Sequence, residues 1–140
     1  MPSLRKIYKQ GSTPVISLPP NVMKFCGASL GSHLIIYPIS PTALIAEVSQ
    51  EEQSTIFGTE RIRQMRSVIV RKVYRQGNSF VCSISAFVLD RVGIGVGDYL
   101  SIQTLSDNAF TLTAKTSAQV SFEQSQGRIP YRNAERANPG

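Results

Sequence analysis

The sequence Arg-Lys-Val-Tyr-Arg-Gln-Gly at residues 71–77 repeats an earlier stretch, Arg-Lys-Ile-Tyr-Lys-Gln-Gly at residues 5–11. The two stretches are offset by 66 residues. Carried forward without a gap, this offset superposes further identical residues, including Val15 and Val81, Ser17 and Ser83, Val22 and Val88, Gly27 and Gly93, Gly31 and Gly97, Leu34 and Leu100, and Ile36 and Ile102. The chain therefore contains an internal duplication of roughly 44 residues.

The length of the chain indicates that the two copies share one hydrophobic core. At 140 residues the chain is long enough for one ordinary domain, whereas a single repeat of this size buries only a marginal core. We therefore divide the sequence into a first repeat at 1–48, a helical linker at 49–67, a second repeat at 68–114 and a loosely held polar tail at 115–140, with Phe122, Ile129 and Tyr131 as isolated anchors.

Each repeat is predicted to fold as strand, strand, short helix, strand, strand, which is a mainly β fold with short helices. Residues 4–9 alternate apolar and polar side chains and predict the opening strand. A turn at Gly11, where glycine can take positive φ, leads to a second strand around Ile16. The first helix begins at Pro19-Pro20, and its counterpart begins with Ser83 or Ser85 as the N-cap.

Basic residues are concentrated in the opening strands. The first repeat has four basic residues and one acidic residue, and the second has four basic and three acidic residues. In each repeat three of the four basic residues precede the Gln-Gly turn. A solvated edge strand is one explanation, because lysine on an edge discourages aggregation. The same placement in both copies favours a paired basic surface.

The remaining composition argues against metal, cofactor and enzyme functions. Cys26 aligns with Val92 and Cys82 with Ile16, which predicts two buried thiols. With His33 as the single histidine, the three or four convergent ligands of a zinc site are lacking. No paired carboxylates or nucleophile with a base recur, so we expect no catalytic residues, no cofactor and no enzyme activity. No apolar run approaches the roughly 20 residues of a membrane span, and we expect a cytoplasmic protein without a membrane partner.

Several motifs resemble the swapped-hairpin DNA-binding domain of the AbrB, MazE and SpoVT group. In the second repeat these motifs are Gly77-Asn78-Ser79, an apolar strand, a short helix, and Val-Gly-Ile-Gly-Val-Gly-Asp at residues 92–98. In the first repeat they are residues 11–14, residues 16–19 and Gly31. The resemblance covers both repeats and neither the linker nor the tail. It implies a pseudo-dimer in which the tandem repeats of one chain exchange hairpins to complete one barrel.

The resemblance implies that double-stranded DNA lies against the opening strands and the following loops, and that the protein regulates transcription. The implied DNA-binding residues are Arg5, Lys6, Lys9, Ser12, Arg71, Lys72, Arg75 and Asn78, and the other basic residues of the repeats, Lys24 and Arg91, complete the predicted set. The chain has Ser17 and Ser83 where many antitoxin members carry an arginine. The alternative function is an antitoxin that binds its own promoter and a toxin or other protein through its tail, although such tails are typically acidic and this one is basic. A homo-oligomer of pseudo-dimers, paired through the linker or the tail, is a further alternative.

Overall fold

The computed structural model describes residues 2–50 and 67–126. The first repeat forms β1 (Ser3–Lys6), β2 (Tyr8–Gln10), β3 (Thr13–Leu18), α1 (Pro20–Phe25), β4 (His33–Ser40) and β5 (Ala43–Ser49). The second repeat forms β6 (Ile69–Lys72), β7 (Tyr74–Gln76), β8 (Ser79–Ser83), α4 (Ala86–Arg91), β9 (Tyr99–Ser106) and β10 (Ala109–Lys115), and α5 (Ser117–Ser125) follows. The fold is mainly β with short helices, as the sequence predicts.

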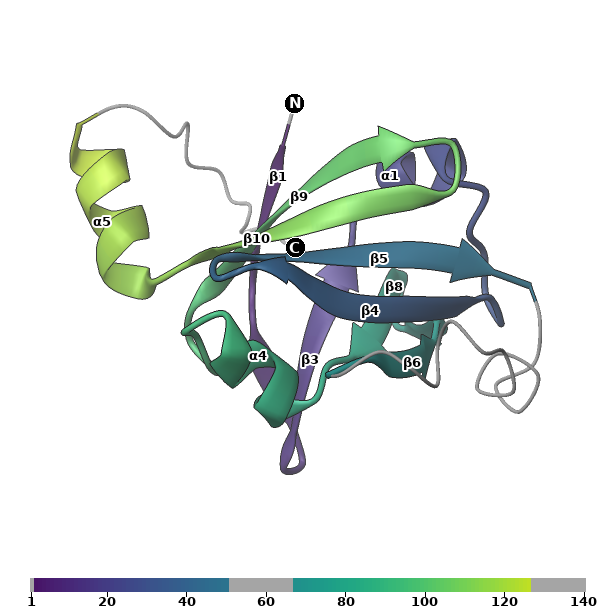
Figure 1. The fold of residues 1–140 in the computed structure, drawn as a ribbon, viewed down its shortest axis with the longest axis horizontal. Helices are drawn as coiled ribbons and strands as arrows, with labels where there is room; N and C mark the ends of the chain where they lie inside the picture. Colours follow the sequence, from purple (N-terminus) through teal and green to yellow (C-terminus); the bar gives the residue numbers. More distant parts are fainter. Residues whose placement is uncertain (1, 51–66, 127–140) are drawn as a thin grey trace.

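The strands form two antiparallel sheets, and each sheet contains strands of both repeats (Figure 1). The larger sheet has the order β1-β9-β10-β5-β4-β6, and the smaller has the order β2-β3-β8-β7. The opening strand of each repeat pairs with the other repeat, because β1 lies beside β9 and β6 lies beside β4. Neither repeat therefore completes the larger sheet by itself.

The pairing register relates the two repeats by a local two-fold axis. In the smaller sheet Ile16 pairs with Cys82, and in the larger sheet Ile45 pairs with Thr111. Both pairs join residues that are equivalent in the duplication. In an antiparallel pair, the two-fold axis passes midway between a residue and the equivalent residue that it faces. The axis therefore passes through the centres of both sheets.

The opening segment of each repeat is two strands, where the sequence predicts one. Between β1 and β2 the chain passes through Ile7, which is buried. Its amide donates to the carbonyl of Asp98 (2.8 Å) and its carbonyl accepts from the amide of Gly97 (2.9 Å). Val73 makes the equivalent bonds with Ser32 and Gly31 (2.8 and 3.0 Å). Each opening segment is thus held at a turn of the other repeat and passes from the larger sheet to the smaller one.

One hydrophobic cluster joins both sheets, both repeats and the two short helices, as the length of the chain predicts. Cys26 and Cys82 are free thiols buried within it. Burial in this apolar setting raises the pKa of the Cys82 thiol to about 12, with a smaller opposing effect from the positive charge of Arg71. Burial also raises the pKa of Cys26, whose thiol donates to the carbonyl of Ala109 (3.3 Å). Both cysteines therefore have a packing role.

The turns and helix ends follow local sequence signals. Gly11 and Gly77 have φ of 64° and 62°, as expected for the turns between β2 and β3 and between β7 and β8. Pro20 occupies the first turn of α1. Of the two serines proposed for the second helix, Ser85 is the N-cap, and its hydroxyl accepts from the amide of Phe87 (3.1 Å).

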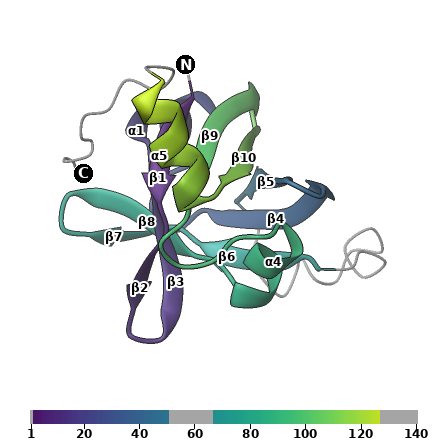
Figure 2. The same cartoon turned by 90° about the vertical axis from the view of Figure 1, so that its left-hand side faces the viewer.

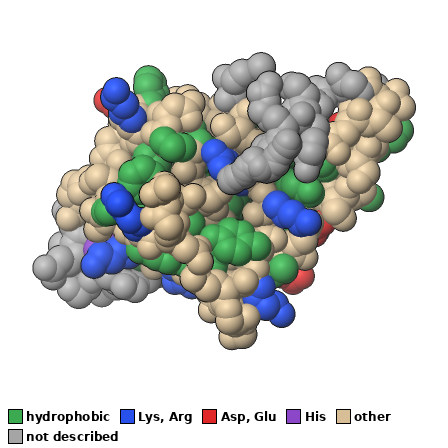
Figure 3. Space-filling view, turned by 180° about the vertical axis from the view of Figure 1, so that it is seen from behind, with side chains coloured by type: hydrophobic (Ala, Val, Ile, Leu, Met, Phe, Trp, Pro, Cys, Tyr) green, Lys and Arg blue, Asp and Glu red, His purple; other side chains and the backbone are tan. Residues whose placement is uncertain are grey.

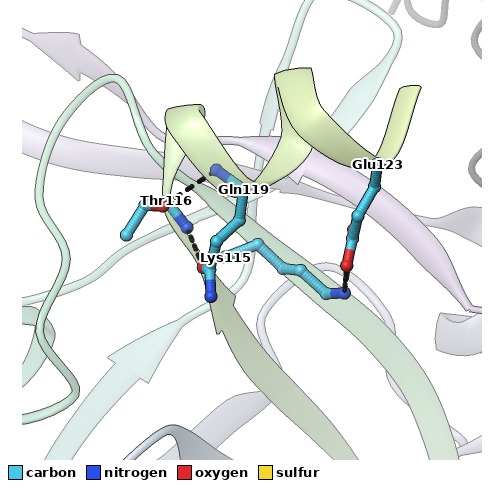
Figure 4. Close-up of polar contacts among 4 residues, drawn as sticks. All are labelled: Lys115, Thr116, Gln119 and Glu123. Carbon is cyan, nitrogen blue, oxygen red and sulfur yellow. Dashed lines mark hydrogen bonds and ion pairs between the residues drawn. The ribbon is translucent and has the colours of Figure 1, made fainter. Parts of the chain in front are cut away.

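Residues 117–125 form a helix where the sequence predicts a loosely held tail. Thr116 caps α5, because its Oγ1 accepts from the amide of Gln119 (3.1 Å) and the Gln119 Oε1 accepts from the amide of Thr116 (2.7 Å) (Figure 4). Lys115 and Glu123 form an ion pair at 3.0 Å. The amide of Ser117 donates to the Asp98 carboxylate (2.8 Å), and Val120 is buried. The spacing of Thr116 and Gln119 encodes this capping box. The prediction of a tail relied on the polar composition of the segment and did not consider that spacing.

Some predictions concern residues outside the described ranges. These are the helix of the linker, which falls largely on residues 51–66, and the anchors Ile129 and Tyr131. Phe122, the remaining predicted anchor, lies in α5 with an exposed ring. Within residues 2–50 and 67–126, no helix has the length and apolar character needed to cross a membrane.

Candidate nucleic-acid interface

The smaller sheet consists of two β-hairpins that meet at the local two-fold axis. Strands β3 and β8 pair at its centre, and β2 and β7 form its edges. Figure 2 shows the two hairpins pointing away from the rest of the fold in different directions, with β2 and β3 downward and β7 and β8 to the left. Their tips contain Gly11-Ser12 and Gly77-Asn78, and Ser12 and Asn78 are exposed.

On one face of this sheet, a reciprocal pair of hydrogen bonds joins the two hairpins. The Tyr8 hydroxyl donates to Gln76 Oε1 (2.7 Å), and the Tyr74 hydroxyl donates to Gln10 Oε1 (2.8 Å). Tyr8 and Gln10 lie on one edge strand and Tyr74 and Gln76 on the other. The two bonds therefore span β3 and β8 and fix one hairpin relative to the other.

Val15 and Val81 are buried on the same face of the sheet as these tyrosines and lie outside the main hydrophobic cluster. Each is paired in register with a tyrosine, Val15 with Tyr8 and Val81 with Tyr74. Side chains alternate between the faces of a strand, so the neighbouring Ile16 and Cys82 point to the main core instead. Burial raises the pKa of both tyrosine hydroxyls, and the proximity of Tyr74 raises that of Tyr8 further. Both hydroxyls stay protonated and keep donating at neutral pH.

Lys9 and Arg75 are exposed on the edge strands of the two hairpins. Lys9 pairs with Pro14 and Arg75 pairs with Phe80, so both lie on the face opposite to the tyrosines. Within the described residues neither side chain has a hydrogen bond or an ion pair. Together with Ser12 and Asn78 they are the predicted site residues that the structure brings onto the projecting hairpins.

The other predicted residues of the opening strands belong to the larger sheet. Lys6 and Lys72 are exposed at the ends of β1 and β6, just before the bends. Arg5 and Arg71 are partly buried. The guanidinium of Arg5 donates to the Ser17 hydroxyl (3.2 Å) and that of Arg71 donates to the carbonyl of Val70 (3.2 Å). The bends at Ile7 and Val73 thus divide the six basic residues between two sheets.

Lys24 and Arg91 lie in the last turns of α1 and α4. Arg91 donates to the Ser67 hydroxyl (2.7 Å) and lies over the ring of Phe87, 5.9 Å from its centroid. Figure 2 places α4 to the right of both hairpin tips and α1 above them. The structure therefore does not bring the helical pair onto the hairpins.

The basic side chains are spread out on the face seen in Figure 3. Seen from behind, Lys and Arg appear as separate side chains between hydrophobic ones, and acidic side chains lie near the margins of this face (Figure 3). Residues 3–18 and 69–83, which contain both hairpins and the opening strands, include no aspartate or glutamate. The hairpins therefore carry positive charge that no acidic residue of these segments neutralises.

Sequence reasoning missed the contribution of Tyr8, Tyr74, Gln10 and Gln76. Their signal was present, because tyrosine and glutamine recur at equivalent positions on either side of Lys9 and Arg75. Alternation along a strand places them on one face, but only the structure shows that each pair bridges the two hairpins. Their role is to hold the hairpins in position.

The described part of the chain contains no group of three or more His, Cys, Asp or Glu side chains that could hold a metal ion. No family model, curated protein or solved structure matches the chain. A function therefore has to be inferred from the chemistry and placement of the residues described above.

Proposed function

We propose that this chain is a DNA-binding transcriptional regulator that contacts duplex DNA through the hairpins and basic opening strands of two AbrB-like repeats. The observation that carries the proposal is the pair of projecting hairpins, each with an exposed cation, Lys9 or Arg75, and an exposed polar tip, Ser12 or Asn78. An exposed cation recruits DNA through its phosphates, and a polar tip can reach base edges.

The shape of the hairpins suits the proposed ligand. The major groove of B-DNA admits a two-stranded β-ribbon. Each hairpin is such a ribbon, and the two-fold axis between Ile16 and Cys82 relates them in the way that two half-sites of a duplex are related. The bonds from Tyr8 to Gln76 and from Tyr74 to Gln10 set the hairpins in a fixed arrangement before binding.

The proposed architecture is a swapped-hairpin pseudo-dimer within one chain. The exchanged pairings of β1 with β9 and of β6 with β4 support it, as does the single core shared by the repeats. A homodimer would need two chains to form such a surface. One copy of this chain would therefore occupy one DNA site.

The register of β3 and β8 limits the length of that site. Leu18 pairs with Phe80, so Asn78 is level with residue 20, eight residues along the strand from Ser12. At about 3.4 Å per residue and 4.8 Å between strands, the tips are at most about 30 Å apart. One turn of B-DNA is about 34 Å. The contacts proposed for the two tips therefore fall within one helical turn.

The experiment is a measurement of duplex DNA affinity against salt concentration. Contacts with about four to six phosphates give a log-log slope of roughly −4 to −5. Replacing Lys9 and Arg75 by alanine should flatten that slope by about 0.9 for each of the two side chains that contacts a phosphate. The control with the same change in charge is Arg61→Ala with Arg63→Ala in the linker. A larger effect of the linker pair, or no binding to duplex DNA, contradicts the proposal.

The antitoxin alternative depends on the tail as a binding segment. Residues 117–125 of that tail form α5, whose first amide bonds to Asp98 in the turn before β9. Among the described residues no observation favours a toxin as the partner, so we propose regulation of transcription alone.

A further inference from the structure

The two hairpins share a framework and differ in the residues that they expose. Tyrosine, glutamine and glycine occupy equivalent positions in both, and the turn glycines have nearly the same φ, 64° and 62°. The exposed positions between and after them differ. The first hairpin presents Lys9 and Ser12, and the second presents Arg75 and Asn78. One geometry thus displays two chemically different sets of side chains.

The two sets of exposed side chains differ in the hydrogen bonds that they can make with bases. Arginine presents a planar fork of donors that matches the O6 and N7 acceptors of guanine, and the asparagine amide pairs in the same bidentate way with N6 and N7 of adenine. Lysine is a flexible point charge, and serine offers a single hydroxyl. Both hairpins can bind phosphate, but the second has the greater capacity for bidentate base contacts.

Covalent fusion keeps this difference in every molecule. A homodimer presents the same hairpin twice and reads a palindrome. This chain presents one hairpin of each kind, held together by the bonds from Tyr8 to Gln76 and from Tyr74 to Gln10. A duplex bound by both hairpins therefore has two unlike halves.

We propose that the chain recognises an asymmetric duplex site in a fixed orientation, with the second hairpin reading bases through Arg75 and Asn78 and the first holding phosphates through Lys9. This inference rests on the proposed DNA-binding function. It adds that sequence information is concentrated in one half of a site one helical turn long.

Two variants that conserve charge test the assignment. Arg75→Lys with Asn78→Ser gives the second hairpin the side chains of the first, and Lys9→Arg with Ser12→Asn does the reverse. Both change only exposed positions, so equal melting temperatures check that each variant is folded. Bound sequences are selected from a random duplex pool, and affinity is then measured on the preferred duplex and on a scrambled one.

We expect an asymmetric motif for the native chain. Arg75→Lys with Asn78→Ser should reduce discrimination between the two duplexes by at least about 10- to 100-fold, which is the range of one lost bidentate pair. Affinity for the scrambled duplex should stay within about threefold, because the number of charges is unchanged. Lys9→Arg with Ser12→Asn should make the selected motif more nearly palindromic.

Orientation is measured with a DNA-cleaving chelate on a new cysteine at the first tip, Ser12→Cys. Because Cys26 and Cys82 are buried, labelling is directed to the new residue. Cleavage should occur in the half of the site with less sequence information.

The outcomes separate this inference from the proposed function. A palindromic motif, unchanged discrimination in Arg75→Lys with Asn78→Ser, or equal cleavage in both halves overturns the orientation and leaves DNA binding in place. Failure of the native chain to bind duplex DNA overturns both.

Discussion

Gly11 and Gly77 adopt a left-handed backbone that side chains with a Cβ rarely occupy, and each has open space where a Cβ would stand. The cost of a side chain at these tips is therefore strain in the backbone, without a steric clash. Gly77→Val should lower the free energy of unfolding by more than about 1 kcal/mol. Gly77→Asn should cost less, because asparagine tolerates this region.

Urea unfolding of both variants measures the difference. Gly95→Ala is the matched control, because Gly95 has open space and no positive φ. Equal stability of Gly77→Val and the native chain would show that the turn is misassigned.

Cys82 makes stability depend on pH above the physiological range. Its pKa is about 12 in the folded protein against a reference value of 9.0. Between these values the unfolded chain loses the thiol proton and the folded chain keeps it, so stability is fully present below about pH 9 and falls as pH rises toward 12. The maximum slope is about 1.4 kcal/mol per pH unit.

Cys82→Val should remove this part of the pH dependence and retain the packing, since an aliphatic side chain, Ile16, occupies the equivalent position. Urea unfolding under reducing conditions at pH 8 and pH 10.5 measures it. Equal losses of stability in the variant and the native chain between these pH values would contradict a buried neutral thiol.

At the scale of the elements, the bonds between the hairpins should appear as specific energetic couplings. Tyr8→Phe removes one hydroxyl and should cost about 0.5 to 1 kcal/mol. Combined with Gln76→Ala, its effect should be less than additive, because both changes break one bond.

The comparison pair is Tyr8→Phe with Gln10→Ala, since Gln10 accepts from Tyr74. Its effects should be closer to additive in chemical denaturation. A coupling energy as large as that of the bonded pair would show that the hairpins are not joined as described.

Helix α5 depends on its capping box. Thr116→Ala removes the acceptor for the Gln119 amide and should destabilise the helix by about 1 kcal/mol. Native-state hydrogen exchange should then be about fivefold faster at the amides of α5, with little change in β8. Ser121→Ala, at an exposed position in the same helix, is the control. Faster exchange in both variants alike would argue against the cap.

Local signals in the sequence predicted most elements, because turns, caps and alternation are properties of short segments. The glycine turns and the Ser85 alternative follow from such signals, and the buried cysteines follow from the alignment of the two repeats. The break of the opening strand did not, because Ile7 leaves its strand for partners about 90 residues away, at Gly97 and Asp98. For the same reason the sequence placed the basic residues of each opening segment on one strand, whereas the structure divides them between two sheets.

At the scale of the whole molecule, the repeats depend on each other for folding. β1 has its neighbour in β9, β6 has its neighbour in β4, and the main cluster draws on both repeats. A fragment of residues 1–50 lacks β9, β8, β6 and β10, which pair with β1, β3, β4 and β5 in the whole chain. Long-range pairing of this kind makes the folded state cooperative, because no half retains a complete sheet or core.

Fragments 1–50 and 67–126 should therefore each be unfolded or self-associated when alone. Mixed in equal amounts, they should form a one-to-one complex with the circular dichroism of the intact chain, because β1 and β6 then have their partners. Sedimentation equilibrium gives the stoichiometry, and thermal melting should depend on concentration for the complex but not for the intact chain. A 1–50 fragment that melts cooperatively as a monomer would contradict the shared core, since its edge strands would then be stable without β6 and β9.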